Sequence, residues 1–158
     1  MPCMGIGLVV SCLLTGYATA MKLTFKILCV PIGKGRPRVT ARGKFAHAYT
    51  PKKTKDYEKF LKAEAATAMT GWAPLTGPLK VDIQFTMPIP KSVTKKGREL
   101  MLTGTVKHTK KPDSDNLAKS VLDALNGVVW EDDSLIYDLH VTKYYGAEPG
   151  IIITVVTE

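Results

Sequence analysis

Four segments of this chain carry the apolar residues, alternating or in short runs, that are typical of strands. The segments 22–30 and 76–90 alternate and are rich in β-branched residues, so each predicts a strand. The segments 134–146 and 150–158 predict two more strands, and the Gly- and Pro-containing turn between them predicts a hairpin. These patterns therefore predict four strands, of which the last two follow one another directly.

Two other segments show the 3.6-residue spacing of amphipathic helices. The Thr-Pro pair at 50–51 is typical of an N-cap and a first helical residue, so a helix is expected from there to about Met69. Its apolar residues Tyr57, Phe60, Leu61 and Ala65 fall on one side, which is expected to face the core. A second helix is expected after Pro112, because proline disfavours helical backbone in the residue before it, and the Asn-Gly pair at 126–127 typically ends a helix. On a helical wheel its apolar face carries Leu117, Val121, Ala124, Leu125 and Val128, and its polar face carries Asp115, Lys119, Asp123 and Asn126.

The order of these elements, β-α-β-α-β-β, predicts an α+β fold. A chain of 158 residues is long enough for one domain with its own core. Helices with one apolar face bury that face against a sheet. We therefore expect a single small domain with a mixed β-sheet and helices on one face. The segment 31–49 is expected to form a basic loop or irregular hairpin, and 91–104 a basic loop with one or two helical turns.

The first twenty residues, called the leader below, are apolar and contain no Lys or Arg. They end in Ala-Thr-Ala and so resemble a secretory signal, yet they lack its positive N-terminal region and are short for a membrane span. Two interpretations remain open: a secreted or lipid-anchored protein, or an upstream start before a true first residue, Met21. We expect the second, with a cytoplasmic domain over 21–158, no membrane partner and no disulfide framework, because Cys29 is the only cysteine beyond the leader.

The net charge of +8 is unevenly distributed along the chain. Residues 22–111 carry 20 Lys and Arg against 5 Asp and Glu, whereas residues 112–158 carry 2 against 9. A basic segment of this size is typical of proteins that bind a polyanion such as DNA, although lysine-rich surfaces also serve solubility alone. The acidic remainder is informative because its residues are concentrated in two short motifs.

The first acidic motif is KKPDSDNLAKSVLDAL, residues 110–125. Asp113 and Asp115 stand at the expected start of the second helix. There they could cap the helix, or they could aim together at a divalent cation. Asp123 lies about 12 Å further along the helix than Asp115, which is too far to share one ion. The first motif therefore offers two carboxylates for one metal site.

The second acidic motif is WEDDS, residues 130–134. Asp132 and Asp133 are adjacent, so in an extended segment their side chains point to opposite sides, and only one can easily join the first pair. Metal-dependent hydrolysis of a phosphodiester needs both the carboxylates of these motifs and the Lys and Arg residues of the basic segment. Carboxylates hold the divalent metal, and Lys and Arg hold the phosphate backbone. The two motifs together predict a metal-dependent site that acts on nucleic acid.

The same motifs and an upstream basic segment carry a family resemblance. The stretch KKPDSDNLAKSVLDALNGVVWEDDS resembles the signature of RusA-type endonucleases, the Holliday junction resolvases of bacteria and their phages. The stretch GKGRPRVTARGKFAHAYTPKKTKDYE is similar to that family's N-terminal Gly-Arg-Pro-Arg and Tyr-Thr-Pro-Lys-Lys-Thr motifs. The resemblance spans about residues 22–157. It implies a Mg²⁺-dependent endonuclease, of phage or prophage type, that resolves four-way DNA junctions in recombination and repair.

The resemblance also implies roles for individual residues. Asp113, Asp115 and Asp133 are expected to be catalytic and to bind Mg²⁺, with Mn²⁺ as a substitute, while Asp132 is a supporting residue beside them. Lys119 corresponds to the family's functional lysine, which would contact the scissile phosphate or offset charge that develops there. The structural alternative for Lys119 is an ion pair with Asp115. The implied partners are branched DNA and a second copy of the chain, in a homodimer, with no organic cofactor.

Basic residues on both sides of the first predicted helix are expected to hold the DNA. Arginines present a fork of donors that suits phosphates, and lysines near a helix start can reach backbone oxygens. His108 is a weaker candidate, as a ligand or a base. The alternative function is a non-catalytic basic DNA-binding protein, in which the acids serve structure alone. The expected DNA-binding residues are Lys34, Arg36, Arg38, Lys52, Lys53, Lys110 and Lys111.

Overall fold

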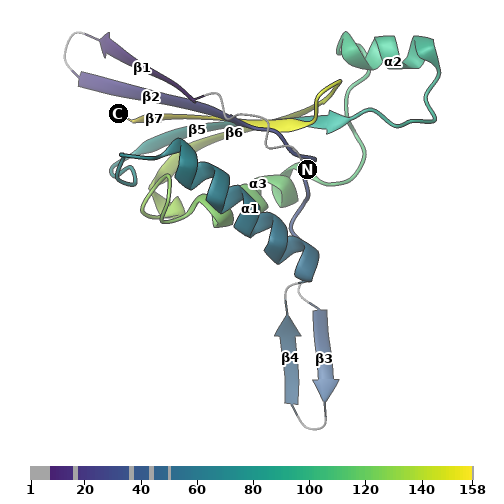
Figure 1. Cartoon of the computed structure of the whole chain (residues 1–158), viewed down its shortest axis with the longest axis horizontal. Helices are drawn as coiled ribbons and strands as arrows, with labels where there is room; N and C mark the ends of the chain where they lie inside the picture. Colours follow the sequence, from purple (N-terminus) through teal and green to yellow (C-terminus); the bar gives the residue numbers. More distant parts are fainter. Residues whose placement is uncertain (1–7, 16–17, 36–37, 43–44, 50, 158) are drawn as a thin grey trace.

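The computed structural model describes residues 8–15, 18–35, 38–42, 45–49 and 51–157 and shows one α+β domain, as predicted (Figure 1). The strands are β1 (Leu8–Thr15), β2 (Ala18–Ile27), β3 (Arg38–Arg42), β4 (Phe45–Tyr49), β5 (Leu79–Pro88), β6 (Ile136–Gly146) and β7 (Gly150–Thr157). The helices are α1 (Lys52–Ala68), α2 (Lys95–Leu102) and α3 (Ser114–Leu125), and η1 (Asp133–Leu135) is a 3-10 turn.

Five strands form a mixed sheet in the order β1-β2-β7-β5-β6. β5 and β6 are parallel, and the other neighbouring pairs are antiparallel. The predicted hairpin of the last two strands is wrong, because β5 lies between β6 and β7. Every second residue of β5 from Leu79 to Met87 is buried, whereas β6 exposes Tyr137 and Leu139. The more apolar strand, β5, therefore takes an inner position, and β6 takes the edge.

The predicted leader joins this sheet. Residues 8–15 form β1, which pairs with β2 from Leu8 opposite Phe25 to Thr15 opposite Ala18. β2 accordingly begins before the predicted strand start at residue 22 and ends at Ile27 rather than Val30. The start at Met21, with residues 1–20 as an upstream extension, stays a prediction.

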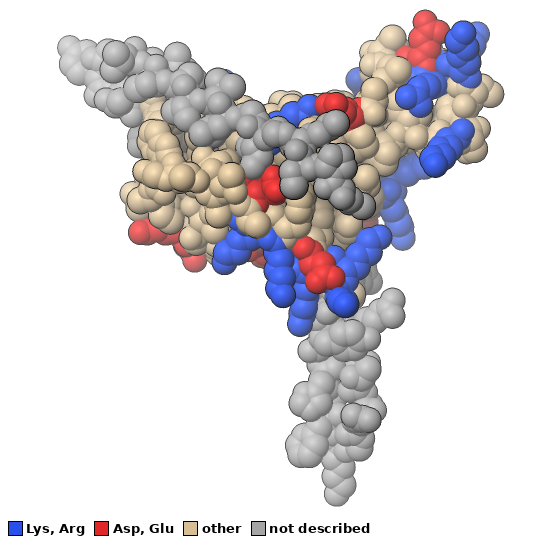
Figure 2. Space-filling model, viewed as in Figure 1, with Lys and Arg blue, Asp and Glu red and all other residues tan. Residues whose placement is uncertain are grey.

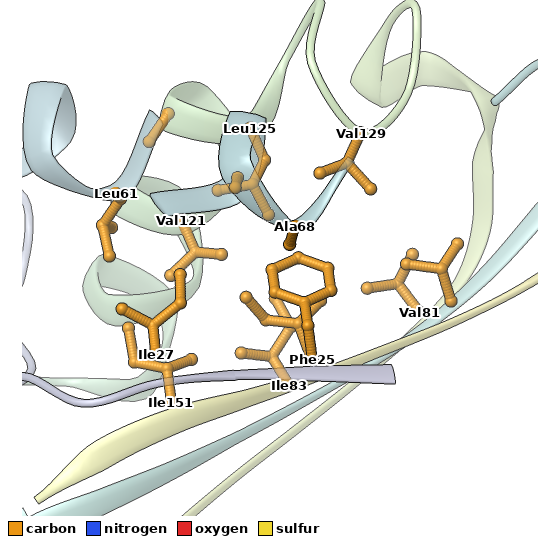
Figure 3. Close-up of a cluster of buried hydrophobic side chains, with 14 of the residues drawn as sticks. Phe25, Ile27, Leu61, Ala68, Val81, Ile83, Val121, Leu125, Val129 and Ile151 are labelled. Atoms are coloured by element: carbon orange, nitrogen blue, oxygen red, sulfur yellow. The ribbon is translucent and has the colours of Figure 1, made fainter. Parts of the chain in front are cut away.

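The two long helices cover one face of the sheet, as predicted (Figure 1). Figure 3 shows Leu61 and Ala68 of α1 and Val121 of α3 pointing at sheet residues such as Phe25 and Ile83. All of these side chains are buried. The apolar face predicted for α3 is confirmed, with Leu117, Val121, Ala124 and Leu125 buried and Val128 partly buried.

The apolar face predicted for α1 needs one correction. Phe60 was expected to face the core, but it is 39% exposed, and Tyr57 and Leu61 are buried instead. The buried positions of α1 continue through Ala65 and Ala68, a stripe that Phe60 borders but does not join. At the start of α1 the N-cap position is Pro51, while the predicted cap, Thr50, lies outside the described residues.

Two further elements stand apart from the layered body. The segment expected to be a basic loop contains α2, whose N-cap Thr94 accepts a hydrogen bond from the Gly97 amide over 3.2 Å. No residue of α2 is buried, and the helix lies away from α1 and α3 (Figure 1). The β3–β4 hairpin extends beyond the start of α1 in the same view. None of the described helices combines the length and apolar character of a membrane span.

Cys29 lies just after β2 rather than within a strand. Its thiol is free and half-buried, with Sγ 3.9 Å from the Tyr57 hydroxyl. Burial raises the pKa of the Cys29 thiol to about 11, so the thiol stays protonated and unreactive at neutral pH.

Candidate active site at the start of α3

The start of α3 presents two exposed carboxylates. Asp113 is the N-cap residue, with extended backbone (φ −72°, ψ 150°), and its side chain makes no capping hydrogen bond. Asp115 follows in the first turn, and both residues are exposed. The Lys111–Pro112 peptide bond before them is cis. The sequence left open that Asp113 serves only as a helix cap. Its side chain makes no such bond, so capping is not its role.

Backbone contacts with the segment after β2 fix this end of the helix. The Lys34 amide donates to the Asn116 carbonyl over 2.9 Å, and the Ser120 hydroxyl donates to the Ile32 carbonyl over 3.0 Å. Ser120 is fully buried. The two bonds tie two successive turns of α3 to a segment that lies 88 residues away from Ser120 in sequence.

A groove of about 750 Å³ opens beside Asp113. On one wall Gly33 packs against Pro112 so closely that a Cβ at Gly33 would lie 2.8 Å from the proline Cβ. The groove is also lined by three lysines, Lys34, Lys53 and Lys111. Three cations beside a carboxylate are a suitable environment for a phosphate whose oxygens share a metal ion with that carboxylate.

The basic surface extends beyond the groove. Figure 2 shows Lys and Arg side chains gathered around the first half of α1 and, separately, on the lobe that carries α2. Four of the predicted DNA-binding residues are exposed: Lys52, Lys53, Lys110 and Lys111. Arg36 lies outside the described residues, and Arg38 begins β3, where only the backbone is described.

Lys34 differs from these residues, because its ammonium already has protein partners. It pairs with Glu58 of α1 over 3.4 Å and with Asp123 of α3. These ion pairs link the two helices that cover the sheet. Asp123, which helix geometry had excluded from the metal site, therefore has a structural partner, and Lys34 has less charge to offer a phosphate than the sequence suggested.

The second acidic pair sits at η1, and its two members differ. Asp132 has extended backbone and caps the turn, because its carboxylate accepts the Ser134 amide over 2.8 Å. Hydrogen bonds from the side chain and backbone of Ser134 lower the pKa of Asp132. Asp133 is exposed in the first turn of η1. Asp132 thus serves the local backbone, whereas its neighbour is the more available ligand.

The two acidic pairs lie toward opposite ends of α3. The Trp130 carbonyl accepts the Gly127 amide over 2.8 Å, so the chain just before Asp133 is beside the C-terminal end of the helix. Asp113 is at the other end of a 12-residue helix, about 18 Å away. Among the described residues, no three His, Cys, Asp or Glu side chains are close enough to hold one metal ion. One copy of the chain therefore does not bring Asp133 to Asp113 and Asp115.

Lys119 projects from the exposed face of α3, one turn after Asp115. In the described part of the chain, no ion pair within 4.0 Å joins its ammonium to Asp115. The structural alternative for this lysine is therefore not realised. Its side chain remains available to a ligand that approaches the start of the helix.

Three residues that support the site were not identified from sequence: Gly33, Asn116 and Ser120. Each contacts a segment more than 75 residues away, and no local spacing predicts such a contact. Gly33 had one weak signal, since glycine within a basic loop often marks a close approach of two backbones.

Comparison with known proteins identifies the family of this chain. The family described as endodeoxyribonuclease RusA matches residues 29–156, which contain both acidic pairs and all three groove lysines. A relative from Bacillus subtilis strain 168, the uncharacterized protein YqaN, is 36% identical over 135 residues, which cover 84% of this chain and 94% of the relative. The chain therefore belongs to the RusA family of endodeoxyribonucleases and is a hydrolytic DNA nuclease.

Proposed function

We propose that this nuclease is a Mg²⁺-dependent, structure-selective endonuclease that resolves four-way DNA junctions by paired symmetric cuts. The observation that carries the proposal is the exposed Asp113–Asp115 pair beside a groove lined with lysines. A basic groove attracts branched DNA, and the carboxylates at its edge can hold a metal ion that promotes hydrolysis of a phosphodiester. A protein that only binds DNA would be weakened by carboxylates in that position.

The donor set at the start of α3 suits Mg²⁺, with Mn²⁺ as a substitute. Mg²⁺ prefers oxygen ligands and is commonly held by one or two carboxylates, with waters and substrate phosphate as the remaining ligands. Asp113 and Asp115 supply two exposed carboxylates. A metal bound there supplies a Lewis acid and lowers the pKa of a coordinated water.

The lysines around this pair would position the DNA and stabilise charge during the reaction. Lys53 and Lys111 line the groove and would bind phosphates on the two sides of the scissile bond. In hydrolysis, water adds to phosphorus, the bond from phosphorus to O3′ breaks, and O3′ takes a proton. The products are a 5′-phosphate and a 3′-hydroxyl. Lys119, exposed one turn after Asp115, would offset the charge that develops on the phosphoryl oxygens.

A homodimer gives Asp133 a place in this site. Within one copy Asp133 lies toward the far end of α3 from Asp113. In a two-fold symmetric pair, Asp133 of the second copy would approach the start of α3 in the first, and the reverse contact would form the second site. Two equivalent sites also match the two-fold symmetry of a four-way junction. We propose that each site uses Asp113 and Asp115 from one copy and Asp133 from the other, in a cytoplasmic enzyme.

The test is incubation of the protein with a synthetic four-way junction, with and without Mg²⁺, beside the variants Asp113→Asn and Asp115→Asn. The wild type should make paired symmetric cuts only with the metal, and both variants should bind the junction but cut it at least about a hundredfold more slowly. Binding by the wild type without any cleavage would overturn the proposal. Normal cleavage by both variants would keep the activity but reject these ligands.

A further inference from the structure

An ammonium group on β6 is bonded to the chain that leads into the candidate site. Lys143 donates from Nζ to the Lys110 carbonyl over 2.9 Å and to the Pro112 carbonyl over 2.9 Å. The two carbonyls lie two residues apart, and the second belongs to the peptide bond that joins Pro112 to Asp113. One side chain therefore holds both ends of the turn that precedes the first metal-binding candidate.

These bonds bear on Asp113 because its position is set through the backbone. The Asp113 side chain makes no capping hydrogen bond, so the direction of its carboxylate depends on where the chain enters α3. From the other side, Gly33 packs against Pro112, as described above. Lys143 and Gly33 therefore hold the same proline from two different segments, β6 and the loop after β2.

A second contact from β6 supports the same turn. Tyr145 is two residues after Lys143, and side chains two apart on a strand point to the same side. Its ring lies 4.6 Å from that of His108, which is only 8% exposed. Burial and then the neighbouring charges of Lys143 and Lys110 lower the pKa of His108. The buried His108 ring thus packs against Tyr145, and its lowered pKa keeps it from adding a positive charge beside Lys143 at neutral pH.

We propose that Lys143 is a positioning residue for the nuclease reaction, acting through the Lys110 and Pro112 carbonyls to hold Asp113 where it binds the metal. This inference rests on the proposed function of Asp113. Lys143 itself touches neither metal nor DNA in this proposal. Its effect is on the geometry of the carboxylate, and a misplacement of about 1 Å in a catalytic group can slow a reaction on the order of a hundredfold.

The experiment compares Lys143→Met with Lys143→Arg. The methionine keeps an unbranched apolar stem and removes the donor, whereas the guanidinium can again donate to both carbonyls. We expect Lys143→Met to lower the cleavage rate at saturating junction about tenfold or more, with junction affinity unchanged, and Lys143→Arg to restore much of the rate. Lys96→Met is the matched control, because it removes the same charge from α2, a helix with no buried residues.

A second measurement does not depend on activity. The Leu117 amide donates to the Asp113 carbonyl over 3.1 Å, the first helical bond of α3. The hydrogen-exchange rate of the Leu117 amide, measured without metal or DNA, should be higher in Lys143→Met than in the wild type. In Lys143→Arg the rate should return toward the wild-type value. If the methionine variant does not fold, Lys143→Gln takes its place, because its uncharged amide is one atom shorter than the lysine side chain and should not donate to both carbonyls.

The possible outcomes separate the roles of Lys143. Weaker junction binding with an unchanged rate at saturation would make Lys143 a phosphate contact and overturn the proposal. A lower melting temperature with wild-type rate and wild-type exchange at Leu117 would make it a purely structural residue, and this too would overturn it. If the wild type cuts no junction with any divalent metal, the proposed function fails, while exchange at Leu117 still decides whether Lys143 holds the start of α3.

Discussion

The two acidic pairs of this chain look alike in sequence and differ in the structure. Asp113 and Asp115 flank the start of a well-packed helix, and the backbone that carries them is held by Gly33 on one side and Lys143 on the other. The pair at η1 sits on a three-residue turn, where one carboxylate caps the backbone. The first pair is therefore positioned by contacts from distant segments, whereas in the second pair one carboxylate itself stabilises the turn that carries both residues.

This difference indicates what each pair can contribute to a metal site. A held backbone preorganises two carboxylates, which lowers the entropic cost of binding an ion. In the second pair Asp132 is already engaged with Ser134, so its exposed neighbour Asp133 is the more available ligand. We therefore expect the first pair to be the main part of the site and Asp133 to complete it from a second copy.

The largest predicted effect separates Asp133 from Asp132. Asp133→Asn should slow junction cleavage at least about a hundredfold. Asp132→Asn should cleave nearly as fast as the wild type, because the asparagine oxygen still accepts the Ser134 amide and keeps the turn. Single-turnover cleavage rates measure both variants. Equal losses in the two would show that the assignment of Asp133 over Asp132 is wrong.

Mixing inactive variants tests whether a site takes acids from two copies. In a heterodimer of Asp113→Asn with Asp133→Asn, one of the two sites would be fully wild type and the other doubly altered. Co-expression should then recover roughly a quarter of the wild-type sites in a random mixture of dimers, and roughly half once heterodimers are purified through two affinity tags, seen as single nicks. If all ligands of a site come from one copy, every heterodimeric site carries a substitution, and no activity should return.

The next largest effect concerns the backbone that holds the first pair. Gly33→Ala would place a methyl 2.8 Å from the Pro112 Cβ, so the start of α3 must shift. We expect cleavage to slow by about tenfold. The matched control is Gly35→Ala, whose methyl would lie 2.8 Å from the Thr54 hydroxyl on α1 instead. The control should lower the melting temperature without a comparable loss of cleavage rate at saturating junction. Similar losses of rate in both variants would show that Gly33 does not specifically position Asp113 and Asp115.

A smaller effect concerns where the DNA lies relative to the first pair. If Lys53 and Lys111 bind phosphates, each change to methionine should reduce the slope of log affinity against log salt by about 1. Lys34→Met should change that slope less, because its ammonium is paired with Glu58 and Asp123, and it should lower the melting temperature more. Junction binding between low and physiological salt measures the slopes. The reverse order would place the DNA over Lys34 instead.

The smallest predicted effect is a pH dependence of stability from His108, whose buried ring packs against Tyr145. Burial lowers its pKa in the folded protein, so the unfolded chain binds a proton first as the pH falls. Its contribution to stability is therefore complete above the ordinary histidine pKa, near 6.5, and is lost as the pH falls through the lowered folded value. Thermal melts from pH 7.5 to 4.5 should show a smaller decline in His108→Gln. An identical decline in the two proteins would contradict this origin.

The sequence determined the local elements well, because their signals are local. Pro112 and the Asn-Gly pair at 126–127 predicted a helix between them, and α3 runs from Ser114 to Leu125. The 3.6-residue spacing also identified its buried face correctly. Phe60 was misassigned in α1, because an aromatic residue at the border of an apolar stripe has the same spacing whether it faces the core or solvent.

The sequence also identified the chemistry, since two Asp pairs within a basic chain and a recognisable motif suffice to name a metal-dependent nuclease family. Only the tertiary structure decided how those acids are arranged. It placed β5 between the last two strands, separated Asp133 from Asp113, and engaged Lys34 in ion pairs. It also brought Lys143 to the turn before Asp113. Such contacts depend on which surfaces are buried together when distant segments pack, and the spacing of residues along the chain does not predict that packing.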